Sequence, residues 1–339
     1  MNVMLGSSES SVRNPHQCSA NSSRYSLALS ALTSSKHNCL KLASLNVHQL
    51  SAHIDELRVL LLHSNIDVLA IQETKLDESD LDSDFHIPGY VLKPRRDRLT
   101  DGGGGVCFYV SETINFIPRP DLRMRELENE CIEIHHPHSK PIIVVNWYRP
   151  PKAPVSIFSQ LESLLSRLDV TNNEYYLLGD MNADMLSTKY DNDVRLLNNT
   201  TDIYGLQQLI NEPTRITEKS STLLDLIYTN CPDKVLCSGV AHISISDHSL
   251  VFVCRKLSIR FPCSGHKLIT CRCFKNFDKA KFREDINKFA IDVSNLNSID
   301  DPNTLWRFWK TKFLSVVNHH TPIRTQRVRS STLSPLLQV

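Results

Sequence analysis

Short apolar runs alternate along this chain with segments of helical periodicity. Residues 40–46 alternate between apolar and polar positions and predict a strand that ends at Asn46. Ser51 is suited to cap a helix after it. The apolar positions of that helix recur at helical spacing, at Ile54, Leu57, Leu61 and Leu62. Residues 67–71 predict a second, buried strand that ends just before Glu73. A strand, a helix and a strand with short links predict a sheet with a helix on its face.

The same alternation continues through the rest of the chain. Further strands are predicted at residues 90–92, 106–110, 131–135, 141–148, 175–178, 221–228 and 251–253. Helices are predicted at residues 154–168 and 193–209, and an amphipathic stretch at 278–293 is followed by a helix that starts at Pro302. The mixture of short strands and helices predicts the α/β class.

Polar side chains follow several of the predicted strands directly. Asn46 and Glu73 come just past the ends of the first two strands, where layered α/β folds collect their ligand and metal sites. Asp180 and Asn182 follow the strand at 175–178. Asp180 can accept a proton from water, and Asn182 can hold a phosphate oxygen or the attacking water. Glycine, aspartate and asparagine are also common turn residues, so a plain turn is the better explanation of this stretch when it is taken alone, and the rest of the chain has to decide.

A second carboxylate lies inside an apolar run. Asp225 falls within residues 221–228, and a buried carboxylate needs a partner because unpaired burial costs several kcal/mol. The candidate partner is His248, in the sequence Ser246-Asp247-His248. A hydrolase triad of Ser246, His248 and Asp225 is disfavoured, because the chain has no oxyanion turn of the Gly-x-Ser-x-Gly kind.

Composition and charge narrow the class of protein. The 339 residues carry a net charge of +1, but from Arg255 onward there are roughly 16 Lys and Arg against about 6 Asp and Glu. An acidic body with a basic tail suits an enzyme that holds metal on carboxylates and meets a polyanion. The ten cysteines form no Cys-x-x-Cys pair, which predicts reduced thiols in a cytosolic or nuclear protein. No apolar run reaches membrane-spanning length, and residues 1–36 lack the apolar core of a secretory signal.

Taken in order, these motifs resemble the endonuclease/exonuclease/phosphatase superfamily. The resemblance covers about residues 38–254 and rests on Asn46, Gln72-Glu73-Thr74, Tyr148, Gly179-Asp180-x-Asn182, Asp225 and Ser246-Asp247-His248. Finer motifs resemble the endonuclease of jockey-type non-LTR retrotransposons, namely Trp147-Tyr148-Arg149-Pro150-Pro151, Pro213-Thr214-Arg215 and residues 222–227. The tail resembles the linker that leads to the reverse transcriptase of such elements. The chain contains no Tyr-Ala-Asp-Asp polymerase motif, so it looks like a copy truncated before the reverse transcriptase, without that activity.

The resemblance implies a fold and a division of the chain. The implied fold is a four-layer α/β sandwich with two mixed β-sheets packed face to face and helices outside. Residues 1–38 are expected to form a disordered leader, residues 39–254 the endonuclease/exonuclease/phosphatase domain, and residues 255–339 a basic helical linker.

The resemblance also implies roles for eight residues. Glu73 would be the main carboxylate for Mg²⁺, with Mn²⁺ as an alternative ion, and Asn46 would help at the same place; oxygen ligands of this kind suit such hard ions. Asp180 would activate or orient the attacking water, and Asn182 would hold that water or a phosphate oxygen. His248 would donate to the phosphate, while Asp225 fixes its tautomer and raises its pKa. Tyr148 would donate to another phosphate oxygen. Asp247 would either support the metal or contact one of its ligands.

The expected function is a Mg²⁺-dependent DNA endonuclease that nicks one strand and leaves a 3′-hydroxyl for target-primed reverse transcription. DNA is the expected partner, with retrotransposon RNA or a reverse transcriptase domain in trans as further ones, in the nucleus or cytoplasm and away from membranes. Two alternatives stay open. The same fold serves phosphomonoesterases and lipid or inositol phosphatases, and a non-catalytic retrotransposon relic would act only as a binding module.

Overall fold

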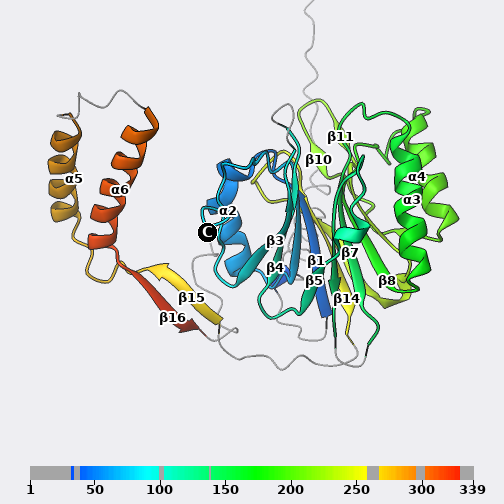
Figure 1. Ribbon diagram of the computed structural model, residues 1–339, viewed down its shortest axis with the longest axis horizontal. Helices are drawn as coiled ribbons and strands as arrows, with labels where there is room; N and C mark the ends of the chain where they lie inside the picture. Colours follow the sequence, from blue (N-terminus) through cyan, green and yellow to red (C-terminus); the bar gives the residue numbers. More distant parts are fainter. Residues whose placement is uncertain are drawn as a thin grey trace, which may run out of the picture. The chain divides into compact units, whose positions relative to one another are not determined.

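The computed structural model describes residues 32–33, 39–98, 103–136, 139–257, 267–294 and 302–328. These residues form two compact units, divided between Cys263 and Ser264. The first unit contains two six-stranded mixed sheets, in the strand orders β13-β14-β1-β2-β4-β3 and β5-β6-β7-β8-β12-β9. Figure 1 shows the sheets side by side, with α2 outside one of them and α3 and α4 outside the other. The predicted four-layer sandwich is therefore confirmed.

The first sheet and its helix are built from β1 (Cys39–Asn46), α2 (Leu50–His63), β2 (Val68–Gln72), β3 (Tyr90–Arg96), β4 (Val106–Ser111), β13 (Val235–Ala241) and β14 (Leu250–Lys256). The strands β1 and β2 are parallel, so their carboxyl ends lie at the same edge. Helix α2 starts at Leu50 without a side-chain cap, so the predicted cap at Ser51 is wrong. Leu62 on this helix is 40 % exposed, and Leu50 is buried on the inner face instead.

The second sheet and its helices are built from β5 (Phe116–Pro118), β6 (Glu128–Ile134), β7 (Ile142–Tyr148), α3 (Ile157–Val170), β8 (Glu174–Asp180), α4 (Asn192–Ile203), β9 (Gln207–Gln208) and β12 (Asp225–Thr229). Two single 3-10 turns, Pro120–Leu122 and Pro232–Lys234, and a small ribbon of β10 (Arg215–Ile216) and β11 (Ser221–Thr222) complete the unit. The predicted strand at 221–228 is thus two strands. It breaks because Thr214 Oγ1 accepts hydrogen bonds from the backbone amides of Leu224 and Asp225.

Buried polar side chains join the two sheets near the edge where β1 and β2 end. Gln72 Nε2 donates to Asn146 Oδ1 at 2.6 Å, and Asn146 Nδ2 donates to the carbonyl of Ile71 at 2.9 Å. Both side chains are fully buried. Because a buried amide is costly to leave unpaired, these bonds fix the position of one sheet on the other.

Residues at both ends of the expected domain also belong to the first unit. Leu32 is 1 % exposed and packs in the hydrophobic cluster beneath α2, and its carbonyl accepts from Lys41 Nζ at 2.9 Å. At the other end, β14 continues to Lys256, and buried Arg255 forms an ion pair of 2.7 Å with Glu174.

The second unit consists of the antiparallel strands β15 (Lys267–Arg272) and β16 (Ile323–Val328), with the helices α5 (Lys279–Ser294) and α6 (Pro302–His320) between them along the chain. The sequence predicted its helices but not the strand pair. No helix among the described residues is long and apolar enough to cross a membrane.

Candidate active site

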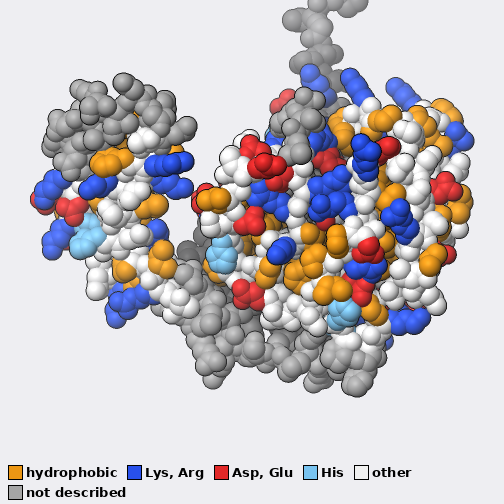
Figure 2. All heavy atoms as spheres, viewed as in Figure 1, with side chains coloured by type: hydrophobic (Ala, Val, Ile, Leu, Met, Phe, Trp, Pro, Cys, Tyr) orange, Lys and Arg blue, Asp and Glu red, His pale blue; other side chains and the backbone are white. Residues whose placement is uncertain are grey.

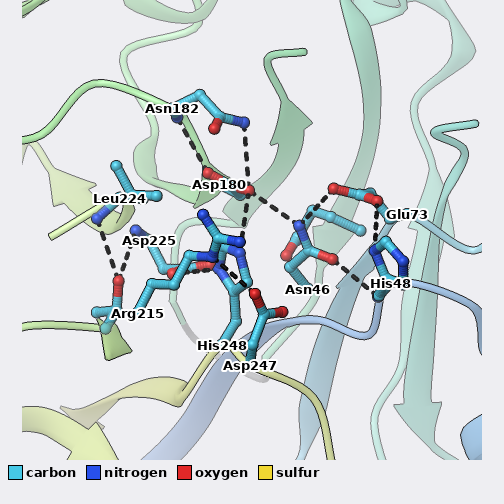
Figure 3. A network of polar contacts seen from close by, with 12 residues as sticks. Asn46, His48, Glu73, Asp180, Asn182, Arg215, Leu224, Asp225, Asp247 and His248 are labelled. Carbon is cyan, nitrogen blue, oxygen red and sulfur yellow. Dashed lines mark hydrogen bonds and ion pairs between the residues drawn. The ribbon is translucent and has the colours of Figure 1, made fainter. Parts of the chain in front are cut away.

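Four strand ends bring polar side chains together at one edge of the sandwich. Asn46 ends β1, Glu73 follows β2, Tyr148 ends β7 and Asp180 ends β8. The strands β7 and β8 are parallel, so Tyr148 and Asp180 emerge at the same end of their sheet. Figure 3 shows the side chains of Asn46, Glu73 and Asp180 turned toward one another.

Asn46 connects the two sheets. Its Nδ2 donates to Glu73 Oε1 and to Asp180 Oδ2, both at 2.9 Å, while its Oδ1 accepts from the amide of His48 at 2.9 Å. The side chain is 1 % exposed. One amide therefore lies between two carboxylates that come from different sheets.

Glu73 has a second set of neighbours. Its backbone is left-handed, with φ of +53°, a conformation that is uncommon for residues other than glycine. Tyr148 donates its hydroxyl to Glu73 Oε1 at 2.9 Å, and His48 Nδ1 and Lys75 Nζ lie 3.3 and 3.9 Å from Oε2. Burial, and next the charge of Glu73, raise the pKa of Tyr148, so its hydroxyl stays a donor.

The backbone around Asp180 is held by close packing against β7. A Cβ on Gly179, whose φ is +146°, would lie 1.8 Å from the carbonyl oxygen of Trp147, so only glycine fits there. Asn182 is also left-handed, and its amide donates to Asp180 Oδ1 at 3.0 Å. Buried Arg149 donates to the carbonyl of Asn182 at 3.1 Å and pairs with Asp193.

Asp180 itself is surrounded by charges. It is 1 % exposed, and burial followed by the charge of Asp225 raises its pKa to about 7, against the opposing effect of His248. His248 Nε2 lies 4.0 Å from Asp180 Oδ2. A carboxyl poised near neutrality can exchange a proton with water or with a phosphate ester.

His248 is oriented by Asp225. Its Nδ1 lies 2.9 Å from Asp225 Oδ2, which leaves Nε2 directed to the Asp180 side. Burial alone lowers the pKa of His248, but the charge of Asp225 and its hydrogen bond outweigh it and raise the pKa to about 9. The imidazole is therefore a cation at neutral pH and donates from both nitrogens.

Asp247 lies beside this group rather than within it. Its Oδ2 accepts from Arg215 Nε at 2.7 Å, and its side chain is 43 % exposed. Among the described residues, Asp247 forms no hydrogen bond with Asn46, Glu73 or Asp180. The Arg215 backbone forms a β-bridge with His248, so this ion pair fastens the loop that carries the histidine (Figure 3).

Two groups of side chains could hold a cation. Asp180, Asp225 and His248 offer ligand atoms within 4.8 Å of one another. However, a cation there would have to displace the proton from Nε2 of His248, and the charge of Asp225 raises the pKa of this imidazole to about 9. Glu73, Asn46 and Asp180 offer carboxylate and amide oxygens, which is the donor chemistry of Mg²⁺ and Mn²⁺ sites once the Asn46 amide turns its oxygen inward.

Several residues that shape the site were not predicted as contributors. Arg149 braces the Asp180–Asn182 turn, Thr214 holds the backbone at Asp225, and His48 and Lys75 flank Glu73. Arg149 stood in a motif already singled out, but a buried arginine has no sequence signal until its carbonyl partners are known. His48 is two residues past Asn46, and this nearness to a strand end was the only available clue.

Comparisons with known proteins agree with this geometry. A family model described as the endonuclease/exonuclease/phosphatase family matches residues 38–248. A search of curated protein sequences found no match.

Solved structures share the fold at low identity. The endonuclease domain of TRAS1, a telomere-specific non-LTR retrotransposon, is 19 % identical with a TM-score of 0.54, over 65 % of this chain and all of that one. The catalytic domain of Xenopus laevis APE2 is 15 % identical with a TM-score of 0.50, over 66 % and 94 % of the two chains. An AP endonuclease from Archaeoglobus fulgidus is 17 % identical with a TM-score of 0.50, over 65 % and 100 %. With the family model matching well over half of the sequence, the chain belongs to the endonuclease/exonuclease/phosphatase family.

Proposed function

We propose that this protein is a divalent-metal-dependent DNA endonuclease that nicks one strand and leaves a 3′-hydroxyl. The observation that carries the proposal is the convergence of Glu73, Asn46 and Asp180 with a cationic His248 at one strand edge. Oxygen ligands beside a fixed proton donor suit hydrolysis of a phosphate ester.

Each residue has a proposed task. Asp180 accepts the proton of the attacking water, and Asn182 orients that water or a non-bridging oxygen. His248, held by Asp225, donates from Nε2 to the phosphate as negative charge builds on it, and Tyr148 supplies a second donor. Glu73 and Asn46 would hold Mg²⁺ or Mn²⁺, which when bound neutralises charge on the phosphate. We assign Asp247 to positioning: its pair with Arg215 fastens the loop of His248.

A cationic depression beside Tyr148 supports a polymeric substrate. Its volume is about 760 Å³. Five basic side chains and three acidic ones line it, an excess of two positive charges: Arg96, Arg98, Arg123, Arg125 and Lys152 against Asp97, Glu126 and Glu128. Arg125 and Lys152 are exposed, and Lys152 follows the two prolines directly after Arg149. Figure 2 shows Lys and Arg side chains gathered, with a few acidic ones, on the upper part of the face of the first unit. A small phosphomonoester needs no such extended cationic surface, whereas a DNA backbone does.

We also propose a retrotransposon origin of the jockey type. The sequence motifs around Tyr148, Thr214 and residues 222–227 support it, and the fold shared with the TRAS1 domain is consistent with it. In this proposal residues 39–254 carry the chemistry. The basic second unit would meet DNA, retrotransposon RNA, or a reverse transcriptase domain supplied in trans.

The proposal is tested on two substrates in parallel. Purified full-length protein with Mg²⁺ or Mn²⁺ is given supercoiled plasmid, and separately a nucleoside monophosphate and vesicles that contain a phosphoinositide. We expect open-circular plasmid and no release of inorganic phosphate. Phosphate release from either of the latter substrates without plasmid relaxation would establish a phosphatase instead, and no turnover of any substrate would leave the binding-module alternative.

Two surface variants refine the test. Lys152→Ala and Arg125→Ala should weaken plasmid binding and flatten its salt dependence, since each removes one phosphate contact. Hydrolysis of a small phosphodiester should be unchanged, because neither side chain contacts the strand-end cluster of Asn46, Glu73, Asp180 and His248.

A further inference from the structure

Three cysteines gather on one face of the first sheet, far along the strands from the strand-end cluster. Cys39 begins β1, Cys254 lies on the neighbouring strand β14, and Cys237 lies on β13 at the edge of the sheet. Cys237 is paired with Cys254 just after the register of β13 shifts between Val235 and Cys237, and Cys254 is directly opposite Lys41. Residues opposite each other, and residues two apart on one strand, point to the same face. The three thiols therefore share the face that α2 covers, around Lys41.

The three thiols differ in their surroundings. Cys254 is 3 % exposed, Cys39 is half-buried and Cys237 is exposed. Hydrogen bonding with Cys39, burial, and then the charge and hydrogen bond of Cys237 raise the pKa of the Cys254 thiol. Both other thiols thus lie near enough to Cys254 to affect its proton, and one of them is open to solvent while the other is half-buried.

We propose that Cys237 and Cys254 are a modification site. They form a disulfide with each other, across the two strands, by exchange with a small-molecule disulfide such as oxidised glutathione. Directly opposed residues of an antiparallel pair have Cα atoms about 4.5 or 5.5 Å apart, which is within the range that a disulfide spans. Cys39 is opposite Lys256 and therefore diagonal to Cys254. Diagonal neighbours are about 7–8 Å apart, beyond the usual disulfide range, so the geometry selects Cys237 as the partner.

The reaction takes two exchange steps. The exposed Cys237 thiolate attacks one sulfur of oxidised glutathione, forms a mixed disulfide and expels one glutathione thiolate. Cys254 gives its proton to the glutathione thiolate expelled first, attacks Cys237 Sγ and expels the second glutathione. The two protein thiols are oxidised, the glutathione disulfide is reduced to two thiols, and the two protons released by the protein are taken up by the two glutathiones.

The bond would act on the loop that carries the histidine. Residues 238–253 lie between the two cysteines, and Asp247 and His248 lie among them. Closing a loop of this size restricts the unfolded chain, so the oxidised protein should unfold at a Tm about 5–10 °C higher. The disulfide would also tie edge strand β13 to β14.

The test uses the full-length reduced protein, oxidised glutathione, rapid alkylation and peptide mapping by mass spectrometry. We expect a linked pair of peptides that contain Cys237 and Cys254, a raised Tm, and reversal of both by dithiothreitol. Cys237→Ser should abolish the linked pair, whereas Cys39→Ser should leave it intact. A mixed disulfide that persists on Cys237, a link between Cys39 and Cys254, or alkylation of both Cys237 and Cys254 after oxidation would each overturn the proposal.

Discussion

Replacing Asp180 with asparagine should lower the rate of nicking and, at the same time, raise the free energy of unfolding. Burial and the charge of Asp225 raise the pKa of Asp180 from 3.8 to about 7. An acid with a raised folded pKa holds its proton more tightly in the folded chain. Asp180 therefore does not reduce the stability of the fold below about pH 4. The loss of stability grows as the pH rises to about 7 and is complete above that.

The magnitude follows from the two pKa values. The difference between 3.8 and about 7 corresponds to a ceiling of about 4 kcal/mol, at about 1.4 kcal/mol for each unit. Asparagine keeps the bond from the Asn182 amide, because its carbonyl can replace Oδ1. It loses the bond from Asn46 Nδ2, which costs about 1 kcal/mol or more. We expect Asp180→Asn to be more stable than the parent by about 1–3 kcal/mol at pH 8, and by less at pH 5.

Activity should move in the opposite direction. Removal of a general base costs on the order of 100- to 10,000-fold in rate, so single-turnover nicking should nearly disappear. Plasmid binding should stay within a few-fold or tighten, because one negative charge that faces phosphate is gone.

The assay combines denaturation at pH 5 and pH 8 in EDTA with single-turnover nicking and filter binding. Asp233→Asn is the matched control, since it removes an exposed aspartate at the far end of β12. It should change neither rate nor the pH dependence of stability. Nicking by Asp180→Asn at near the parent rate would refute the role of this residue, and lower stability at pH 8 would refute the electrostatic reasoning.

Three further predictions follow from the site and the domain. The single-turnover nicking rate should rise with pH as Asp180 loses its proton, at or below about pH 7 because a bound cation favours the carboxylate, and fall through about pH 9 as His248 loses its own; a flat profile would contradict both assignments. Gly179→Ala should destabilise the fold by about 3 kcal/mol or more, measured by urea denaturation, because a Cβ there meets a backbone carbonyl at 1.8 Å. A fragment of residues 39–254 should unfold cooperatively, but at a lower temperature than a fragment that also contains Arg255–Leu257. The shorter fragment lacks the buried ion pair between Arg255 and Glu174, and equal melting temperatures would show that this pair contributes nothing.

The site residues that the sequence predicted best are polar residues directly after short apolar strands. Asn46, Glu73 and Asp180 each follow a short apolar strand closely, and parallel pairing within each sheet brings such ends to a common edge. The pairing of Asp225 with His248 was predicted from the cost of burying a lone carboxylate, and the two side chains lie 2.9 Å apart. These inferences needed only the periodicity of the strands and the free energy that burial of an unpaired carboxylate requires.

The sequence was least informative where partners lie far apart along the chain. For Asp247 the resemblance implied that it supports the metal or contacts one of its ligands; its ion pair with Arg215, which comes from the ribbon of β10 and β11, was not predicted. Strand β13 has exposed Leu236 and Cys237 and a register shift, which blurs its alternation. Arg149 was not predicted to be buried, yet backbone carbonyls and Asp193 accept from the two terminal nitrogens of its guanidinium inside the fold, while its Nε has no partner among the described residues. In each case the deciding interaction depends on tertiary packing that no local window contains.

The most direct test of the central proposal is the chemistry of the nicked end. Supercoiled plasmid is incubated with the purified chain and Mg²⁺, with an EDTA control and with Asp180→Asn, and the product is then given to a DNA polymerase. We expect open circles in the Mg²⁺ reaction only, with 3′ ends that the polymerase extends without prior phosphatase treatment. Nicking that persists in EDTA, or ends that are extended only after phosphatase treatment, would contradict the proposed reaction.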